Sequence, residues 1–336
     1  MPRRTEPPLG SGGHLCVFAS SEAGKPAYYQ RLVAISHTWG SLALPVNTSL
    51  RYVLSAHGLS LLFNRRHAAM TMSALHDEAA TAIRDKMPTS VVPSLLAALP
   101  NSSGLKSPIS NENLVVFDAA SRDAFLLHRH QAPVRMEWLI REVFERYVDR
   151  CDWLLLTEDD TYLDLKSVRR VLDAKLAQSQ RRHHYSGSVM GQMYGDFVHG
   201  DFMLFNRAAF ERAHRSLDGC RLEQGGWLDT WLGGCIRLAE GWINYPLKNR
   251  NASDYWRAPD MRPERFPGLL IADSKHILDD FVAATMLPKN GNMLRAASFH
   301  KVSAVDMLVV HAVLRWWSIY KGKSRPRDAL HTHRNG

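Results

Sequence analysis

The chain alternates between short apolar runs and longer stretches of mixed polarity. Residues 14–20, HLCVFAS, form a compact apolar run that predicts a buried strand. Residues 26–40, PAYYQRLVAISHTWG, follow with helical spacing and end in a glycine. A strand followed directly by a helix is the first indication of a layered α/β fold.

The same criteria divide most of the remaining chain into strands and helices. Further strands are predicted at residues 59–63, 113–119, 152–157, 184–191, 201–206 and 296–302. Further helices are predicted at residues 68–87, 134–151, 167–180, 207–217, 227–241 and 304–322, the third of them capped by Asp164 or Ser167. We therefore predict one α/β domain over residues 14–320, with a mixed, mostly parallel sheet flanked by helices. A flexible N-terminus at 1–13 and a basic tail at 321–336 complete the chain.

Three carboxylates, Glu158, Asp159 and Asp160, stand side by side directly after the strand predicted at 152–157. Neighbouring like charges repel, so this arrangement costs free energy unless a positive charge lies among them. A divalent cation is the natural partner, because hard metals take oxygen ligands. In open α/β sheets, ligands bind at the carboxyl ends of strands, which is where this triplet falls.

Composition and charge narrow the class of protein. Hydrophobic residues make up 45% of the chain and charged residues 22%, as in a soluble globular enzyme. The net charge of +9 comes from scattered Lys and Arg without a basic block, and no zinc-finger or RNP-like pattern is present, so we predict no nucleic-acid partner. No signal or transmembrane segment is visible, because the polar N-terminus lacks an apolar stretch and the apolar run at 307–317 is short and interrupted by His311 and Arg315.

Four cysteines are present, and none belongs to a CxxC motif, which argues against a structural zinc site. Cys16 and Cys151 lie in apolar surroundings and are predicted to be buried, reduced thiols. Cys220 and Cys235 are close in sequence and could pair in an oxidising compartment.

The stretch from Val134 to Leu172 resembles the Fringe-like glycosyltransferases of family 31, and within them the core 1 β1,3-galactosyltransferases. The matching parts are Arg135, VFERY, CDWLLLT and EDDTYL, with Glu158 in place of the family's first Asp. Further matches are HLCVFASSEAGKPAYYQRLVAISHTWG, GDFMLFNRAAFERA, CRLEQGGWLDTWLGGC and AASFHKVSAVDMLVVHAVLRWW. The chain departs from the family at residues 198–202, VHGDF, where the family has Ser-Gly-Gly-Ala-Gly. It departs again at Leu228, where the family has Glu.

The resemblance implies a GT-A-like fold and a function. The implied reaction is the inverting, metal-dependent transfer of a hexose from a UDP-sugar, and galactose is the hexose that we expect. The implied acceptor is a sugar hydroxyl of a glycoprotein or glycan. The implied product is a hexose in β1,3 linkage to O-linked GalNAc. The implied location is the Golgi or another secretory-pathway lumen, in association with the membrane.

The resemblance also assigns roles to individual residues. Asp160 and His300 are the implied ligands of a Mn²⁺ or other divalent cation, and imidazole with carboxylate suits Mn²⁺ better than Ca²⁺. Asp229 is the implied general base, and Cys220 and Cys235 the implied disulfide. The implied donor-binding residues are Arg135, Glu158, Asp159, Gly200 and Trp227.

Several alternatives stay open at this point. Asp229 could simply cap a helix, in which case Asp201 or Glu223 is the next candidate base. Arg135 could be a surface charge at a helix start, while Trp39 and Trp138 are predicted to fill the core. The whole chain could be a non-catalytic chaperone or partner subunit, or a basic nucleic-acid-binding protein. Monomer and homodimer both remain open.

Overall fold

In the computed structural model, the described residues are 13–21, 26–40, 44–55, 65–100, 109, 111–117, 131–176, 183–192, 195–220, 228–239, 263–266, 271–273 and 296–323. The strands are β1 (Leu15–Ser21), β2 (Thr48–Ser55), β3 (Leu114–Phe117), β4 (Trp153–Glu158), β5 (Tyr162–Leu163), β6 (Tyr185–Gln192), β7 (Gly195–Asn206), β8 (Pro263–Arg265), β9 (Ile271–Asp273) and β10 (Ser298–His300). The α-helices are α1 (Pro26–His37), α3 (Arg65–Lys86), α4 (Val92–Ala98), α5 (Gln131–Arg146), α6 (Leu165–Leu176), α7 (Arg207–Ser216), α8 (Leu228–Ala239) and α10 (Ala304–Lys323). Short 3₁₀ turns occur at Asn111–Asn113, Val148–Arg150 and Leu217–Gly219.

A mixed, mostly parallel sheet forms the centre of the fold, as the sequence predicts. Its strand order is β3-β2-β1-β4-β7-β6-β8. Strands β3, β2, β1 and β4 are mutually parallel, β7 is antiparallel to both of its neighbours β4 and β6, and β8 is parallel to β6. Only β7 therefore runs against the other described strands of this sheet.

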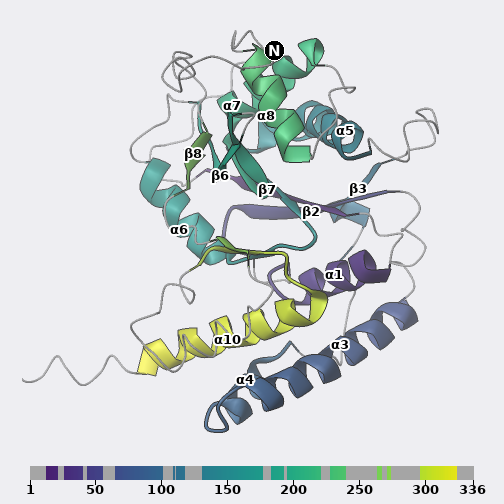
Figure 1. Ribbon diagram of the computed structural model, residues 1–336, viewed down its shortest axis with the longest axis vertical. Helices are drawn as coiled ribbons and strands as arrows, with labels where there is room; N and C mark the ends of the chain where they lie inside the picture. Colours follow the sequence, from purple (N-terminus) through teal and green to yellow (C-terminus); the bar gives the residue numbers. More distant parts are fainter. Residues whose placement is uncertain are drawn as a thin grey trace, which may run out of the picture.

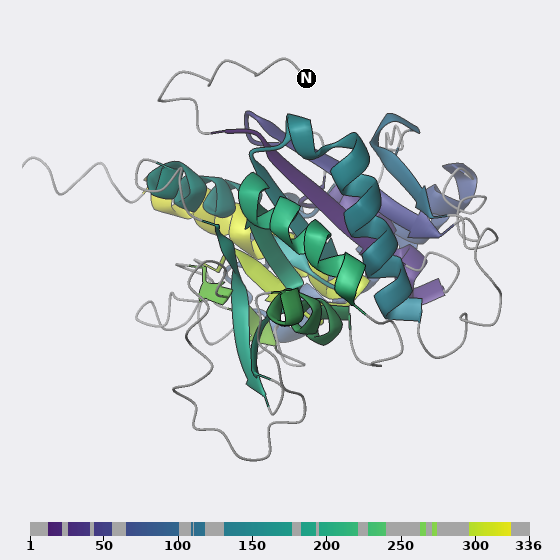
Figure 2. The same cartoon turned by 90° about the horizontal axis from the view of Figure 1, so that it is seen from above.

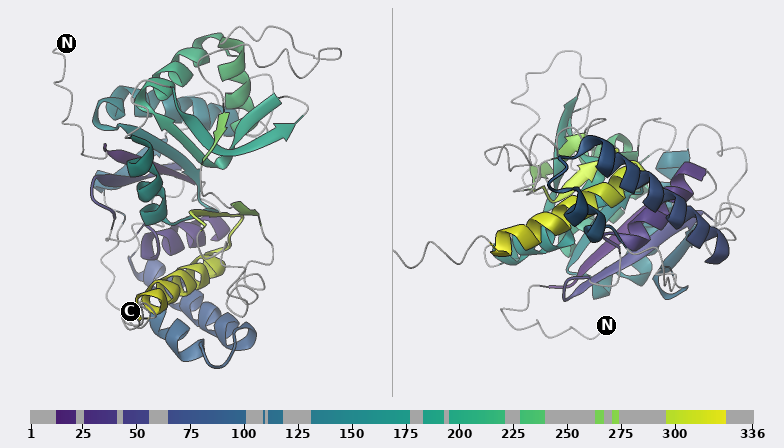
Figure 3. Two further views of the ribbon diagram at one scale, coloured as in Figure 1. Left: turned by 90° about the vertical axis from the view of Figure 1, so that its left-hand side faces the viewer. Right: turned by 90° about the horizontal axis from the view of Figure 1, so that it is seen from below.

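Helices cover both faces of the sheet, so its central strands are buried on both sides (Figure 1). On β1 and β4, Val17 and Leu155 belong to the core cluster beneath α1, α3, α4, α6 and α10. Phe18 and Leu156 belong to the other cluster, beneath α5, α7 and α8. This alternation follows from the two-residue period of a strand. Figure 2 shows α5, α7 and α8 lying over the strands, and Figure 3 shows α10, α3 and α4 on the opposite face.

A second, three-stranded sheet has the order β5-β10-β9. Strand β10 pairs antiparallel with β5, with Phe299 opposite Tyr162, and parallel with β9. Two backbone bonds extend this pairing at its ends: Asp164 N–H to the carbonyl of Ala297 (2.9 Å), and Val302 N–H to the carbonyl of Asp160 (2.8 Å). The small sheet thus brings the end of β10, the last of the described strands, to the residues that follow β4.

The helices and strands predicted from the sequence agree with the structure in most places. Asp164 is the cap of α6, since its carboxylate accepts bonds from Lys166 N–H (3.2 Å) and Ser167 Oγ–H (2.6 Å). The strand at Thr48–Ser55 was not predicted, and the predicted strand at 59–63 lies outside the described residues.

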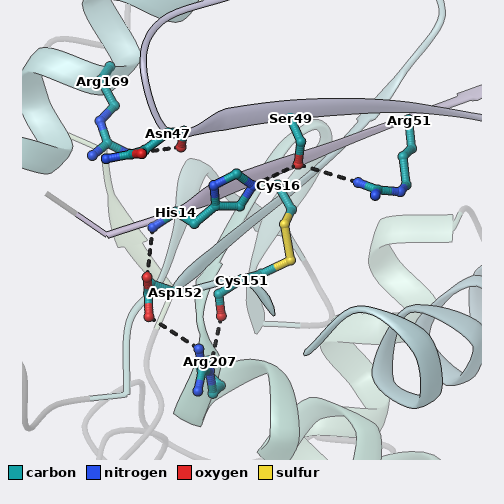
Figure 4. The surroundings of a disulfide bond; sticks show 9 residues. All are labelled: His14, Cys16, Asn47, Ser49, Arg51, Cys151, Asp152, Arg169 and Arg207. Atoms are coloured by element: carbon teal, nitrogen blue, oxygen red, sulfur yellow. Dashed lines mark hydrogen bonds and ion pairs between the residues drawn. A yellow bond between two sulfur atoms is a disulfide. The ribbon is translucent and has the colours of Figure 1, made fainter. Parts of the chain in front are cut away.

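Cys16 and Cys151 are buried as predicted, but the prediction that they are reduced is wrong, because they form a disulfide with their Cα atoms 5.7 Å apart (Figure 4). Strands β1 and β4 are neighbours in the sheet, so residues 135 positions apart in sequence meet. Asp152 supports the junction by accepting bonds from His14 N–H (2.7 Å) and from Arg207 (3.1 Å). The second disulfide, Cys220–Cys235, is present as predicted, with a Cα–Cα distance of 5.3 Å.

Membrane-spanning potential was assessed over the described helices. None of them combines the length and the apolar character that crossing a bilayer requires.

Candidate functional site

Two neighbouring strands bring the candidate residues together. In the pairing of β4 with β7, Leu156 lies opposite Met203, and Thr157 Oγ–H donates to the carbonyl of Asp201 at 2.7 Å. Because β7 runs antiparallel to β4, its middle residues lie beside the carboxyl end of β4. Residues 199–201 are therefore neighbours of the acidic triplet, although about forty residues separate them in sequence.

Asp160 and His300 meet at the edge of the small sheet. His300 Nε2 lies 3.5 Å from Asp160 Oδ1, a contact of ion-pair length. His300 is 4% exposed. Among the described residues, none donates a hydrogen bond to Asp160 Oδ1, which is itself buried. A buried carboxylate oxygen without a donor, beside an imidazole nitrogen, fits a metal cation as the missing partner.

Two overlapping groups in the described part of the chain have the composition of a metal site. One consists of Glu158, Asp160 and His300, and the other of His199, Asp201 and His300. Within each group, one ligand atom per residue lies within 4.8 Å of the others. The groups share His300, so together they form a single carboxylate–imidazole cluster.

Asp159, the middle carboxylate, is held by the first part of the chain. It is 3% exposed and accepts hydrogen bonds from Ser21 Oγ–H, at the end of β1, and from Arg31 (3.3 Å) on α1. Since β1 lies directly beside β4, this contact ties the carboxyl ends of both strands together. Arg31 also offsets part of the negative charge of the triplet.

Asp229 lies in the first turn of α8 and reaches across to β7. Its Oδ2 accepts the N–H of Gly200 at 3.1 Å, and its Oδ1 accepts the N–H of Thr230 at 2.7 Å. The residue is 7% exposed. Glycine at 200 leaves room for the carboxylate of Glu158, because a Cβ there would lie 3.2 Å from Glu158 Oε1, whereas it would make only an ordinary contact of 3.7 Å with Asp229 Cβ.

His199 stands between the carboxylates. Its Nδ1 donates to Asp201 Oδ1 at 2.7 Å, whereas the Asp201 amide, at 3.5 Å from the same nitrogen, is too distant to compete. Its Nε2 lies 3.9 Å from Asp229 Oδ2. Burial lowers the pKa of His199, but the bond and charge of Asp201, with the charges of Asp229 and Glu158, outweigh it, so the pKa is raised.

The remaining predicted site residues are placed as follows. Arg135 lies on α5, and Trp227 and Glu223 fall outside the described residues. Trp39 is in the core, as predicted, where its indole N–H donates to the carbonyl of Thr161 (3.1 Å) just after the triplet. Trp138 packs partly buried against the other core cluster.

Sequence reasoning missed three residues that contact the site: Ser21, Arg31 and His199. Ser21 and Arg31 carry no local motif: the adjacency of β1 and β4 brings Ser21 to Asp159, and the position of α1 brings Arg31. His199 does carry a signal. It is two residues before Asp201 on a strand, and that spacing places both side chains on one face.

Fold and site together define an α/β protein with a carboxylate–imidazole cluster at the carboxyl end of a central strand. No family model matches the chain. Over 109 residues, 30% of its length, the chain is 30% identical to chondroitin sulfate synthase 2 of Homo sapiens. The similarity to chondroitin sulfate synthase 2 of Mus musculus has the same extent. The matched part is 14% of the length of each relative.

Proposed function

We propose that the chain is a metal-dependent glycosyltransferase that uses a UDP-sugar donor. The observation that carries this proposal is the partly buried cluster of Glu158, Asp160 and His300 at the end of β4. The partial similarity to an enzyme named for synthesis of chondroitin sulfate, a sugar polymer, supports sugar transfer. The sequence resemblance supports the finer proposal of an inverting β1,3-galactosyl transfer to O-linked GalNAc and a GT-A-like fold.

In this proposal each part of the cluster has a separate task. Asp160, His300 and Glu158 would hold a divalent cation, and Mn²⁺ suits their mixed oxygen and nitrogen atoms. When bound, the cation supplies Lewis-acid neutralisation of the charge that develops on the UDP leaving group. Asp159, held by Ser21 and Arg31, keeps the end of β4 in place for donor binding.

Asp229 would accept the proton of the acceptor hydroxyl. Each of its carboxylate oxygens accepts one backbone N–H, so the group is oriented and each oxygen keeps a free lone pair. Inverting transfer requires a base on the face of the sugar opposite to the leaving group. Asp201 is a poorer base for this task, because it is fully buried and its Oδ1 already binds His199.

The two disulfides support a site of action in an oxidising compartment, and we propose the lumen of the secretory pathway. The proposed partners are a UDP-sugar and a glycan or glycoprotein acceptor.

Calorimetry of UDP binding with and without Mn²⁺ tests the proposed function. We expect Mn²⁺-dependent binding that Asp160→Asn weakens by at least 10-fold, the lower end of what loss of a supporting group costs a metal site. Asp218→Asn is the matched control, because the Asp218 side chain is 72% exposed on another turn. A screen of UDP-sugars for Mn²⁺-dependent hydrolysis then identifies the donor. UDP binding without turnover of any donor would favour the non-catalytic partner subunit, and absence of UDP binding would refute the proposal.

A further inference from the structure

His199 and Asp201 occupy the segment where the chain departs from the family pattern, and the metal ligands implied by the resemblance do not include them. Both side chains project from the same face of β7 beside the end of β4. Asp201 is 0% exposed, and its Oδ1 accepts the bond from His199 Nδ1. Within the described residues, no donor reaches its other oxygen, Oδ2. Because Asp201 is fully buried, its bond to His199 holds that imidazole in a fixed position.

The orientation of His199 is that of a metal-ligating histidine. Such histidines almost always donate the second ring N–H to a carboxylate or carbonyl, which fixes the tautomer and raises the basicity of the free nitrogen. Here Nδ1 is committed to Asp201, so Nε2 is the nitrogen left for a ligand. Nε2 lies 3.9 Å from Asp229 Oδ2, too far for a direct hydrogen bond.

The ring of His199 also lies against His300. The two imidazoles are in edge-to-face contact, with centroids 4.6 Å apart. Neighbouring imidazoles are a usual arrangement around a transition metal, and His199, Asp201 and His300 satisfy the spacing of a metal group in this structure. The two candidate groups therefore need not hold two ions, because their shared residue, His300, lets one ion draw on both.

We propose that His199 is a second imidazole ligand of the cation at this site, with Asp201 as the buried carboxylate that orients it. This inference rests on the proposed function for the existence of the cation site, and it adds the composition of that site. Two imidazoles with the carboxylates of Glu158 and Asp160 favour a transition ion such as Mn²⁺ or Zn²⁺ over Mg²⁺ or Ca²⁺. Asp201 acts through His199 and is a positioning residue.

Pulsed EPR of the full chain, labelled with ¹⁵N-histidine and loaded with Mn²⁺, counts the imidazoles bound to the ion. We expect two in the unsubstituted protein and one in His199→Gln. His76→Gln, on α3, is the matched control and should keep two. By calorimetry, Asp201→Asn should weaken Mn²⁺ binding by about 10–100-fold, and excess Mg²⁺ should fail to displace Mn²⁺.

The unsubstituted protein decides the question even if a variant fails to fold. A count of one imidazole, or no binding of Mn²⁺, would overturn the inference. Two imidazoles in a protein that neither binds UDP nor transfers sugar would leave the inference standing and remove the proposed function. Sugar transfer with a single bound imidazole would do the reverse.

Discussion

Asp229 shows at the scale of one residue how an acidic side chain in the first turn of a helix can also serve chemistry. An acidic side chain in the first turn of a helix is favoured by the helix dipole, which explains its place in α8 without any function. Its Oδ2, however, binds Gly200 on β7 and lies near His199, so the carboxylate faces the strand that borders the cluster. The structure therefore makes the two roles compatible, and kinetics can separate them.

We predict that Asp229→Asn preserves UDP–Mn²⁺ binding and lowers turnover by about 10²–10⁴-fold, the usual contribution of a positioned base. Asn keeps the shape of the side chain and an oxygen that can accept the Gly200 N–H. Steady-state transfer rates with calorimetry of UDP binding measure both effects. Asp218→Asn, an exposed Asp to Asn change, should alter neither. Transfer at the parent rate in folded Asp229→Asn would mean that Asp229 is only structural.

The sequence placed Asp160 beside His300, but it did not place Arg31 beside Asp159. Asp160 and His300, expected together, do lie side by side. Because 140 residues of sequence separate them, no local pattern predicts their contact, and the expectation came from the resemblance. Arg31 was not predictable, because its contact with Asp159 depends on how α1 packs beside β4.

At the scale of elements, strand β2 shows why an apolar run is an incomplete criterion. Its sequence, TSLRYVLS, contains Arg51, although the strand lies inside the sheet between β1 and β3. The guanidinium is accommodated because it lies over the ring of Tyr147, 4.4 Å from the centroid, and donates to Ser49 Oγ (3.3 Å). Because Arg51 is charged, hydrophobicity alone does not predict this strand.

The disulfides lead to a prediction about stability. In the chain-entropy model, a cross-link stabilises more when it closes a longer loop. Cys16–Cys151 spans 135 residues, whereas Cys220–Cys235 spans 15. That model gives about 5 kcal/mol for Cys16–Cys151 and about 3 kcal/mol for Cys220–Cys235. We expect Cys16→Ala/Cys151→Ala to lower the free energy of unfolding more than Cys220→Ala/Cys235→Ala, as measured by equilibrium urea denaturation.

Non-reducing peptide mapping of the parent protein is the control for this comparison. It should recover both pairs with the connectivity 16–151 and 220–235. Equal losses of stability in the two double variants would argue against the entropic explanation, and free thiols at 16 and 151 would contradict the pairing itself.

At the scale of the whole molecule, helix α10 links one helical layer to the candidate site. It packs against α1, α3 and α4, and its His311 Nδ1 lies 3.1 Å from the hydroxyl of Tyr162, two residues after Asp160. The α/β class and the layers were predictable, because alternating strands and helices fix them. The reversed direction of β7 was not predictable from hydrophobicity, since a strand has the same pattern in either direction.

Burial of His311 predicts acid sensitivity. Desolvation, with a smaller contribution from the charge of Arg315, lowers its pKa from 6.5 to about 4. Between about pH 6.5 and pH 4, His311 is therefore protonated in the unfolded chain but not in the folded protein. The free energy of unfolding consequently decreases as the pH falls through this range. The loss attributable to His311 is on the order of 3 kcal/mol.

Urea denaturation at a series of pH values between 4 and 7 measures this effect. The fall in unfolding free energy should be smaller in His311→Gln than in the parent protein, whereas His76→Gln should follow the parent. Burial lowers the pKa of His14, His37 and His214 as well, so part of the fall should persist. An unchanged pH dependence in His311→Gln would show that His311 is not responsible.

The bond between Cys16 and Cys151 also changes the topology of the polypeptide, because it closes a covalent ring. The ring contains β2, β3 and most of β1, whereas β4, β7, β6 and β8 lie outside it. A protease that cuts the ring once releases no fragment, since the disulfide still joins the two pieces of the chain. The two parts of the sheet, which meet along β1 and β4, would therefore stay in one molecule at a fixed one-to-one ratio after such a nick.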